Sequence, residues 1–417
     1  MKVLWFTNIP MLNVCDVAGI QGSPKGGWMN SLANALIETG EIELAVATNV
    51  MGVELSKYQT GGIKHFILPA RSYLESHFPP TADVLSLWKQ VIDEFQPDII
   101  HFHGTERYYG MLTSQQDFNI PSVISIQGLT SVYHRYYLGG LTFGEVLFSY
   151  SLRDIRHWDG LFQRKQQFKR LSKMEQDIIK SNHNFIGRTR WDKAHVFAMN
   201  PTANYYHGDE LLRPPFHTAI KNSKCVVRHS IFAPTASYPL KGFHWLLRSV
   251  AILKSQFPDV TLRVADAQFS NSWRAEGYNR YLNRLIRDLG LEKNVIPVGM
   301  LSAEEMALEL TRAHVFVAPS LVENLCNGLA EAMLVGTPCV AAFAGGMTTT
   351  VKDGETALCF PPGDEAVMAE CIRRFFLDDE LAEQLSSAAQ VVARARHDNR
   401  RVASDMLNIY RDCIGNM

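Results

Sequence analysis

The chain has 417 residues, of which 46% are hydrophobic and 20% are charged, and its formal net charge is −1. This composition is typical of a globular protein and excludes a largely disordered chain. The near-neutral charge also excludes binding to nucleic acid through bulk positive charge, so we expect no nucleic acid among the partners. The length exceeds one ordinary hydrophobic core, and two domains of about 200 residues are expected.

The seven cysteines are scattered along the chain without a CxxC pair. This pattern favours reduced thiols over a disulfide framework or a zinc site. The N-terminal run VLWFTNIP is interrupted by Asn8 and Pro10 and lacks a signal-peptide pattern. No apolar run approaches the about 18 residues that span a bilayer. These features predict a cytoplasmic protein, and they leave open a peripheral contact with the inner face of the cell membrane.

The first half of the chain alternates short apolar strands with helices. Strands are predicted at residues 3–7, 42–48, 98–102, 121–127 and 184–187, and helices at 28–38, 82–95 and 191–198. Gly26 and Gly27 form a glycine-containing loop after the first strand. This alternation is typical of a doubly wound parallel sheet. We assign residues 1–210 to an N-terminal Rossmann-like lobe.

A loop-like stretch at 207–224, which contains Pro214 and Pro215, precedes a second series of the same kind. Strands are predicted at 225–233, 260–265, 295–298, 315–318 and 339–343, and helices at 243–254, 278–289 and 328–335. We assign residues 211–390 to a C-terminal Rossmann-like lobe and 391–417 to a terminal helical region. The predicted fold class is therefore α/β, with two Rossmann-like doubly wound lobes facing a cleft.

The stretch from Pro319 to Gly346 carries the strongest chemical signal. Glu323 is predicted in a loop and Glu331 inside the following helix, for which Asn327 is the predicted N-cap. Unpaired N–H groups at a helix start bind phosphate oxygens, and a carboxylate one turn further in suits ribose hydroxyls. Taken alone, the spacing of the two glutamates is weak, and two solvated carboxylates are the commoner arrangement.

Neighbouring motifs make the pattern specific. The two glutamates are followed by a Gly-Gly turn and by the block VKDGETALCFPPGD. With these motifs, the C-terminal half resembles the family 4 retaining glycosyltransferases of GT-B fold, also called glycosyl transferases group 1. The matching residues are Glu323, Glu331, Gly345, Gly346, Asp353, Gly354, Thr356, Leu358, Pro361, Pro362, Gly363 and Asp364. The resemblance extends to Gly26–Gly27, to the His101-x-His103 pattern and to Lys241–Gly242.

The resemblance implies a role for each matching site residue. His103, Lys241 and Glu323 take the catalytic positions: His103 faces the transferred sugar, Lys241 neutralises the leaving diphosphate, and Glu323 contacts the donor sugar. The implied donor-binding residues are Gly26, Gly27, Asn324, Leu325, Cys326 and Glu331, the last of which holds the ribose. The terminal helix, around residues 389–413, is expected to return to the N-terminal lobe, as it does in the family.

The resemblance also implies the reaction. The protein is expected to transfer a sugar, with retention, from a nucleotide sugar such as a UDP- or GDP-sugar to a glycan or lipid-linked acceptor. No metal and no cofactor are expected, because Lys241 and the helix start supply the positive charge that the leaving diphosphate needs. The segments GRTRWD and WMNSLANAL resemble bacterial members that build surface polysaccharides. The N-terminal lobe is expected to bind the acceptor, and the C-terminal lobe is expected to bind the nucleotide.

The sequence departs from the family at one phosphate-binding position. An arginine is common before the Lys-Gly pair, but the segment FAPTASYPLKG places Ala233, Thr235 and Ser237 there. Arg188 and Arg190 are weak candidates for the missing cation. Two alternative functions therefore stay open, namely a nucleotide-sugar epimerase on the same fold and a catalytically degenerate nucleotide-sugar-binding subunit. A phosphorylase on this scaffold is disfavoured, because no lysine context indicates its pyridoxal cofactor.

Two further features have more than one interpretation. His101 and His103 share a strand face, which suits two metal ligands, but no spaced third ligand follows. His103, nearer the carboxyl end of its strand, is the better functional candidate. Residues 129–170 are rich in aromatic and basic side chains. This region is consistent with an acceptor-binding insertion, with contact to an anionic membrane, or with helices that simply pack through Tyr and Trp.

Overall fold

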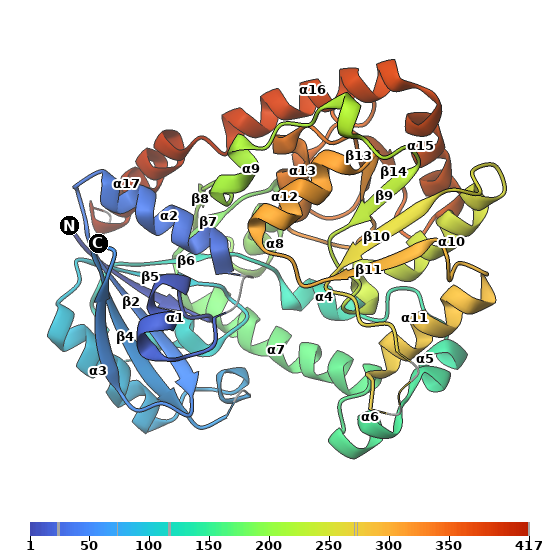
Figure 1. Cartoon of the computed structure of the whole chain (residues 1–417). Coiled ribbons are helices and arrows are strands. Elements are labelled where there is room, and N and C mark those ends of the chain that lie inside the picture. The colour runs from blue at the N-terminus through green and yellow to red at the C-terminus, as the bar shows by residue number, and fades with distance from the viewer. Residues whose placement is uncertain (23–25, 73, 116–117, 271, 273, 416–417) are drawn as a thin grey trace. The chain divides into compact units, whose positions relative to one another are not determined.

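The computed structural model describes residues 1–22, 26–72, 74–115, 118–270, 272 and 274–415 (Figure 1). The chain divides into two compact units. Unit 1 comprises residues 1–131, 169–213 and 397–417, and unit 2 comprises residues 132–168 and 214–396. The sequence analysis assigns 132–168 to the first lobe, whereas in the structure this segment joins unit 2. The reason is its packing, since helix α5 (Phe143–Ser149) contacts helix α11 (Gly277–Asp288) of that unit.

Unit 1 is built on a sheet whose strand order, within the described residues, is β3-β4-β2-β1-β5-β6-β7-β8. The strands are β1 Lys2–Thr7, β2 Glu43–Met51, β3 Ser56–Thr60, β4 Ile63–Ala70, β5 Ile99–His103, β6 Ser122–Ser125, β7 Asn184–Gly187 and β8 Asn204–His207. Neighbouring strands are parallel apart from the antiparallel pair β3–β4. Val3, Trp5 and Phe6 are fully buried because helices cover both faces of a parallel sheet.

The helices of unit 1 follow the predicted periodicity. They are α1 Leu12–Ala18, α2 Gly27–Glu38, α3 Ala82–Phe95, α8 Arg190–Met199 and α17 Asn399–Gly415, with short 3₁₀ segments η2 Glu75–His77 and η3 Tyr108–Ser114. Helix α8 begins at a capping box, in which Thr189 accepts a hydrogen bond from the Asp192 N–H. Helices α4 Thr130–Tyr136 and α7 Leu161–Ser181 each continue from one unit into the other along the chain.

Unit 2 is built on a parallel sheet with the order β11-β10-β9-β12-β13-β14 in the described residues. Its strands are β9 Ser230–Ala233, β10 Thr261–Ala265, β11 Val295–Gly299, β12 Val315–Ala318, β13 Cys339–Ala342 and β14 Leu358–Phe360. Its further elements are α6 Leu152–His157, α9 Pro214–Thr218, η4 Ser223–Cys225, η5 Pro239–Lys241, α10 Phe243–Lys254, α12 Ala303–Arg312, α13 Asn327–Val335, α14 Met347–Thr350, α15 Glu365–Leu377 and α16 Asp379–Arg396. Two Rossmann-like sheets are therefore present, which confirms the predicted fold class for the two lobes.

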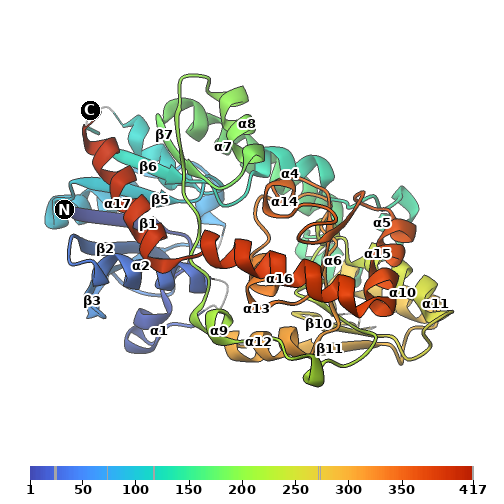
Figure 2. The ribbon, with the colours of Figure 1, turned by 90° about the horizontal axis from the view of Figure 1, so that it is seen from above.

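The end of the chain differs from the predicted single helix around 389–413. Helix α16 ends at Arg396, and α17 begins at Asn399. Asp398 accepts a hydrogen bond from the Arg401 N–H at 2.8 Å and so starts the new helix. Helix α17 belongs to unit 1, where it packs against α2 (Figure 2). Its Tyr410 hydroxyl accepts a hydrogen bond from the Trp5 indole at 3.0 Å.

None of the helices in the described part of the chain is both long and apolar enough to cross a membrane.

Candidate functional site

In unit 2, the two loops that carry Lys241 and Glu323 meet at a reversal of strand order. Strands β9 and β12 are neighbours in the sheet, and the chain proceeds outward from them in opposite directions. Such a switch point, at the carboxyl ends of the strands, is where open α/β sheets bind ligands. Lys241 follows β9 and Glu323 follows β12, and the Lys241 Nζ donates to both Glu323 carboxylate oxygens at 2.8 Å.

Glycines allow these two loops to approach closely. Gly242 has a φ of 70°, and a Cβ at this position would collide with the carbonyl oxygen of Pro319. A Cβ at Gly345, where φ is 57°, would collide with the carbonyl oxygen of Glu323. The next residue, Gly346, donates its N–H to that same oxygen at 2.8 Å. The Lys-Gly and Gly-Gly motifs therefore serve the geometry of one site, because both bring backbone against the Glu323 loop.

The charges in this site are coupled. Burial opposes the positive charge of Lys241, but the Glu323 carboxylate outweighs it and raises the pKa of the lysine. Lys241 therefore stays protonated across the accessible pH range. Burial and the nearby Glu323 charge raise the pKa of the Cys326 thiol to about 12, so this thiol is neutral and a poor nucleophile.

Helix α13 presents its N-terminus next to the Glu323 loop. It begins at Asn327 with Cys326 as the N-cap, and no side chain caps it. Asn327 itself is thus the first helical residue, and the predicted N-cap was wrong by one position. No side chain caps this helix start, and the helix dipole makes it a favourable place for an anion. Glu331 lies one turn further in, where it is 4% exposed.

The other predicted donor-binding residues of unit 2 form the loop between β12 and α13. Asn324 is fully buried, whereas Leu325 and Cys326 are partly exposed. The Asn324 N–H donates to the hydroxyl of Tyr133 at 2.8 Å. The sequence analysis did not identify Tyr133 as a site residue, and the only signal for it was the aromatic density of residues 129–170. One residue of that region therefore holds the loop of the candidate site.

In unit 1, His103 lies at the carboxyl end of β5, next to the end of β1. Its imidazole is 2% exposed, and both ring nitrogens are buried without a hydrogen-bond partner. The ring packs against Trp5 and His101, with centroid distances of 4.5 and 3.9 Å. Burial, followed by the charges of His101 and Arg188, lowers the pKa of His103 well below its usual value, so the ring is neutral.

His101 has a structural role. Its Nδ1 lies 2.7 Å from the Tyr410 hydroxyl and its Nε2 lies 2.6 Å from the Ser125 hydroxyl. Both ring nitrogens are therefore engaged, which leaves none for a metal. Among the residues that the structure describes, no three His, Cys, Asp or Glu side chains form a group able to hold a metal ion.

Two residues that the sequence analysis missed lie beside His103. The Asn8 amide donates to the His103 carbonyl oxygen at 3.3 Å and to Oε1 of Glu106 at 2.9 Å. Asn8 Oδ1 and Glu106 Oε2 are both buried without a hydrogen-bond partner. Unsatisfied buried polar atoms each cost about 1–3 kcal/mol unless a ligand or water pairs with them. The strand end therefore offers several unpaired polar atoms in one place, which is typical of a binding site.

Gly26 and Gly27 begin helix α2 of unit 1. A Cβ at Gly27 would lie 2.7 Å from Cδ of Arg213, so the glycine accommodates that side chain. Arg188, a candidate for the missing phosphate-binding cation, is buried and forms an ion pair with Glu210 inside unit 1. Its guanidinium also lies over the Trp28 ring at 5.4 Å. Because of these contacts, Arg188 lies in the interior of unit 1.

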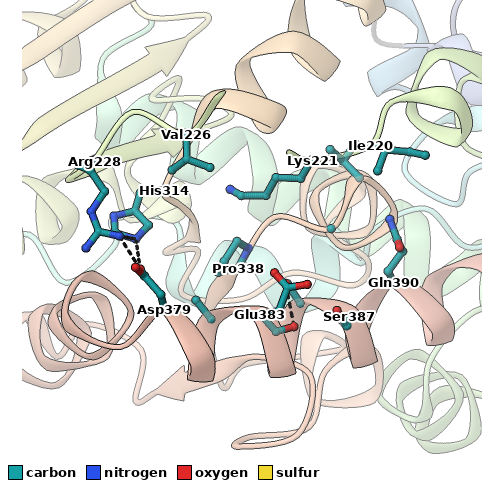
Figure 3. Close-up of a pocket in the computed structure, with 14 residues that line it drawn as sticks. Ile220, Lys221, Val226, Arg228, His314, Pro338, Asp379, Glu383, Ser387 and Gln390 are labelled. Atoms are coloured by element: carbon teal, nitrogen blue, oxygen red, sulfur yellow. Dashed lines mark hydrogen bonds and ion pairs between the residues drawn. The ribbon is translucent and has the colours of Figure 1, made fainter. Parts of the chain in front are cut away.

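A cavity of about 320 Å³ lies at the opposite edge of the unit 2 sheet (Figure 3). Its lining includes His314 and Pro338, which directly precede β12 and β13, and Arg228, two residues before the start of β9. Lys221 extends into it and donates to the Ala313 carbonyl oxygen. None of the predicted site residues lines this cavity, because they all follow the carboxyl ends of the strands.

Comparison with known proteins agrees with this geometry. Residues 231–392 match the family model described as Glycosyl transferases group 1. Over 183 residues the chain is 33% identical to D-inositol 3-phosphate glycosyltransferase of Nocardioides sp. (strain ATCC BAA-499 / JS614), a match that covers 42% of this chain and 39% of that protein. Over 190 residues it is 31% identical to MMP alpha-(1->4)-mannosyltransferase of Mycolicibacterium hassiacum, covering 45% and 44% of the two chains. The matched part of the chain thus spans about two fifths of the length of these curated relatives.

Solved structures match the whole chain at low sequence identity. Sucrose-phosphate synthase from Thermosynechococcus elongatus has a TM-score of 0.74 at 17% identity and covers 100% of both chains. The Anabaena protein Alr3699/HepE in complex with UDP-glucose has a TM-score of 0.69 at 15% identity, covering 99% of this chain and 100% of that one. The fold is therefore that of the two-lobed GT-B proteins. Within it, the match to the Glycosyl transferases group 1 model lies in unit 2, at residues 231–392.

Proposed function

We propose that the protein is a retaining, metal-independent glycosyltransferase that moves a sugar from a nucleotide-sugar donor to a glycan or lipid-linked acceptor. The observation that carries this proposal is the Lys241–Glu323 pair at the switch point of the unit 2 sheet. A permanently charged ammonium and a carboxylate lie there next to an uncapped helix N-terminus. This combination suits a ligand that has both a diphosphate and sugar hydroxyls.

The donor binds through three kinds of contact. The N–H groups at the start of α13 and the Lys241 ammonium attract the diphosphate oxygens. Glu331 accepts hydrogen bonds from the ribose hydroxyls, and Glu323 accepts them from the donor sugar. We assign Gly26 and Gly27 of unit 1 to the donor phosphate. The Alr3699/HepE structures in complex with UDP and glucose and with UDP-glucose support a UDP-sugar, and a GDP-sugar fits the same contacts.

The reaction breaks the bond between the sugar carbon and the diphosphate oxygen. Negative charge then grows on the diphosphate, where Lys241 and the helix N-terminus stabilise it. The acceptor hydroxyl attacks from the same face and passes its proton to the leaving phosphate, so the anomeric configuration is retained. This path uses no protein nucleophile, no metal and no cofactor. The neutral imidazole of His103 accepts a hydrogen bond from the transferred sugar.

We place the reaction in the cytoplasm, in the synthesis of a bacterial surface polysaccharide, with a peripheral contact at the inner face of the membrane. The relatives named above, a D-inositol 3-phosphate glycosyltransferase and an MMP alpha-(1->4)-mannosyltransferase, are bacterial glycosyltransferases by their names and organisms. The unpaired polar atoms of Asn8, His103 and Glu106 support binding of a hydroxyl-rich acceptor in unit 1.

The test is a panel of UDP-, GDP- and ADP-sugars, each measured for its effect on thermal unfolding. A true donor raises the Tm with its concentration, because ligand binding stabilises the folded state. The stabilising donor is then incubated with cell-extract glycans and lipids in the presence of a chelator, and the product anomer is assigned by NMR. We expect release of nucleoside diphosphate and an α-configured product from an α-configured donor.

Three outcomes would contradict the proposal. Loss of turnover in the chelator, restored by a divalent metal, would overturn the metal-independent reaction. An isomerised sugar formed without acceptor would indicate an epimerase. Stabilisation by a nucleotide sugar without turnover for any acceptor would indicate a binding subunit.

A further inference from the structure

Helices α5 and α6 of unit 2 expose an unusual set of large apolar side chains. Six of them are between 53% and 75% exposed, and we refer to them as the α5–α6 face. The residues of this face are Phe143, Leu147, Phe148, Leu152, Ile155 and Trp158. Single exposed apolar residues are common, but six of them on two helices that follow each other in the chain indicate an interaction surface.

The buried side of the same helices carries hydrogen-bonded carboxylates beside the buried Val146. Glu145 accepts hydrogen bonds from Arg248 at 2.9 Å and from the Tyr281 hydroxyl at 2.8 Å. Asp154 is 3% exposed and accepts a hydrogen bond from the Ser151 N–H at 3.1 Å. The carboxylates of the two helices are therefore held by polar partners within unit 2, while six large apolar side chains of the same segment are exposed.

The α5–α6 face is held by well-defined local structure. Both helices begin at complete capping boxes, Thr142 with Glu145 and Ser151 with Asp154. Helix α5 packs against α11 within unit 2 (Figure 1), where Gly277 leaves room for the Ser149 carbonyl oxygen. The exposed apolar side chains are thus presented by anchored helices and not by frayed ends.

Trp158 adds a second observation. It is the C-cap of α6 and has a φ of 53°, a left-handed conformation that glycine or asparagine normally takes at this position. A bulky residue here is less favourable for folding than glycine, and its side chain is 75% exposed. Folding therefore does not account for the tryptophan. Tryptophan does favour the boundary between water and lipid, where its ring meets both environments.

The charges around the α5–α6 face indicate whether its binding partner is positively or negatively charged. All three carboxylates between residues 142 and 160 are engaged: Glu145 pairs with Arg248, while Asp154 and Asp159 pair with Arg153. Arg156 is exposed and forms no ion pair within the described part of the chain. The unbalanced charge beside the apolar side chains is therefore positive, which complements an anionic lipid surface.

We propose that the α5–α6 face inserts into the interfacial region of an anionic lipid bilayer. Short helices that expose Phe, Leu and Trp, with an exposed arginine that forms no ion pair within the described residues, match the composition of interfacial helices. A second copy of the chain is less well matched, because an unpaired Arg156 within an apolar interface would lose hydration without gaining a partner. The proposal specifies where the peripheral membrane contact lies, and it does not require sugar transfer.

Vesicle flotation tests this proposal with the full chain. Wild-type protein is expected to float with mixed phosphatidylcholine–phosphatidylglycerol vesicles and more weakly with phosphatidylcholine alone. The double variant Phe148→Ser/Trp158→Ser should lose at least about tenfold in partition coefficient, because two aromatic side chains no longer enter the interface. The double variant Leu377→Ser/Val391→Ser, which removes exposed apolar side chains elsewhere in unit 2, serves as the matched control and should float like the wild type.

Two further measurements distinguish a lipid surface from other binding partners of the α5–α6 face. Arg156→Glu should weaken flotation with the anionic vesicles only. Light scattering after size exclusion should give the same mass for the wild type and for Phe148→Ser/Trp158→Ser. Equal flotation of those two proteins, or no flotation of the wild type, would overturn the proposal. A wild-type dimer that this double variant converts to a monomer would overturn it as well, in favour of self-association. Because donor-induced stabilisation is measured without lipid, failure here is distinct from failure of the proposed enzymatic function.

Discussion

The hydroxyl of Tyr133 accepts a hydrogen bond from the backbone N–H of Asn324, with 2.8 Å between the two heavy atoms. Tyr133 belongs to the aromatic and basic segment whose role the sequence left open, and Asn324 belongs to the loop between Glu323 and helix α13. Burial, together with the Glu323 charge, raises the pKa of the Tyr133 hydroxyl well above its usual value, so this contact persists at all relevant pH values. The segment therefore supports the donor loop from within unit 2.

Tyr133→Phe should loosen that loop. The Asn324 N–H loses its acceptor, which costs about 1 kcal/mol of stability, and the donor KM should rise several-fold with a smaller change in kcat. Tyr136→Phe, at a neighbouring exposed position of the same helix, is the control. Steady-state kinetics and chemical denaturation of both variants check the prediction. Indistinguishable kinetics for the two would show that the hydrogen bond has no part in donor binding.

Glu331→Ala should weaken binding of the free nucleoside diphosphate. The ribose loses two hydrogen bonds to a charged acceptor, and we expect a loss of about 1.5–3 kcal/mol, or roughly 10–150-fold in affinity. Calorimetric titration measures this directly and needs no acceptor. Glu355→Ala, which removes an exposed glutamate of the same unit, should leave the affinity unchanged. An unaltered Kd for Glu331→Ala would exclude the ribose assignment.

Glu106→Gln should affect the acceptor and spare the donor. Its buried Oε2 has no partner in the structure, and we assign it to an acceptor hydroxyl beside His103. We expect a rise of about tenfold in the acceptor KM, while nucleoside diphosphate binds as before. The exposed Glu54→Gln variant of unit 1 controls for charge. A rise in donor KM alone would place Glu106 outside the acceptor site.

Glu175 should make the stability of the protein depend on pH. It accepts hydrogen bonds from Thr105 and from the Thr130 and Ser131 N–H groups, and burial raises its pKa from 4.5 to about 7. A raised folded-state pKa means that the protonated carboxyl favours folding. Its contribution is complete below pH 4.5 and is lost as the pH rises through about 7. The linked change in unfolding free energy is about 3 kcal/mol.

Comparison of the wild type with Glu175→Gln isolates this effect. The difference in unfolding free energy between the two proteins should shift by a few kcal/mol in favour of the variant between pH 5 and pH 8, as measured by urea denaturation. Other titrating groups cancel in the comparison, including the buried histidines whose lowered pKa values act in the opposite direction. A difference that stays constant across this range would show that Glu175 is ionised in the folded state throughout.

Much of the fold follows from patterns that the sequence displays openly. Helix α3 has the predicted bounds 82–95 because its apolar residues recur at helical spacing and Asp83 favours its first turn. The sequence also placed Lys241 and Glu323 in loops after predicted strands, whereas the hydrogen bond between them emerged only from the structure. The Lys-Gly and Gly-Gly motifs contain glycine because the backbone of another loop lies too close to Gly242 and Gly345 for a side chain.

The features that were missed lack such a local signal. Strand β3 (Ser56–Thr60) is polar and lies at the edge of its sheet, so neither periodicity nor hydrophobicity marks it. The predicted strand at 225–233 begins only at Ser230, because a turn in which the Ser230 N–H donates to the Val227 carbonyl oxygen precedes it. The roles of Tyr133 and Asn8 depend on contacts between residues far apart in the chain, which no spacing within one segment reveals.

The turnover of Lys241→Ala tests the central claim most directly. Lys241 is assigned to the charge that develops on the leaving diphosphate, so its removal should lower kcat by about 10²–10³ while donor affinity changes by less than about tenfold. Lys293→Ala, an exposed lysine of the same unit, is the control and should retain the wild-type rate. The measurement is nucleoside diphosphate release with saturating donor and acceptor, well below the Tm of each variant. A kcat for Lys241→Ala within a few-fold of the wild type would contradict the proposed mechanism.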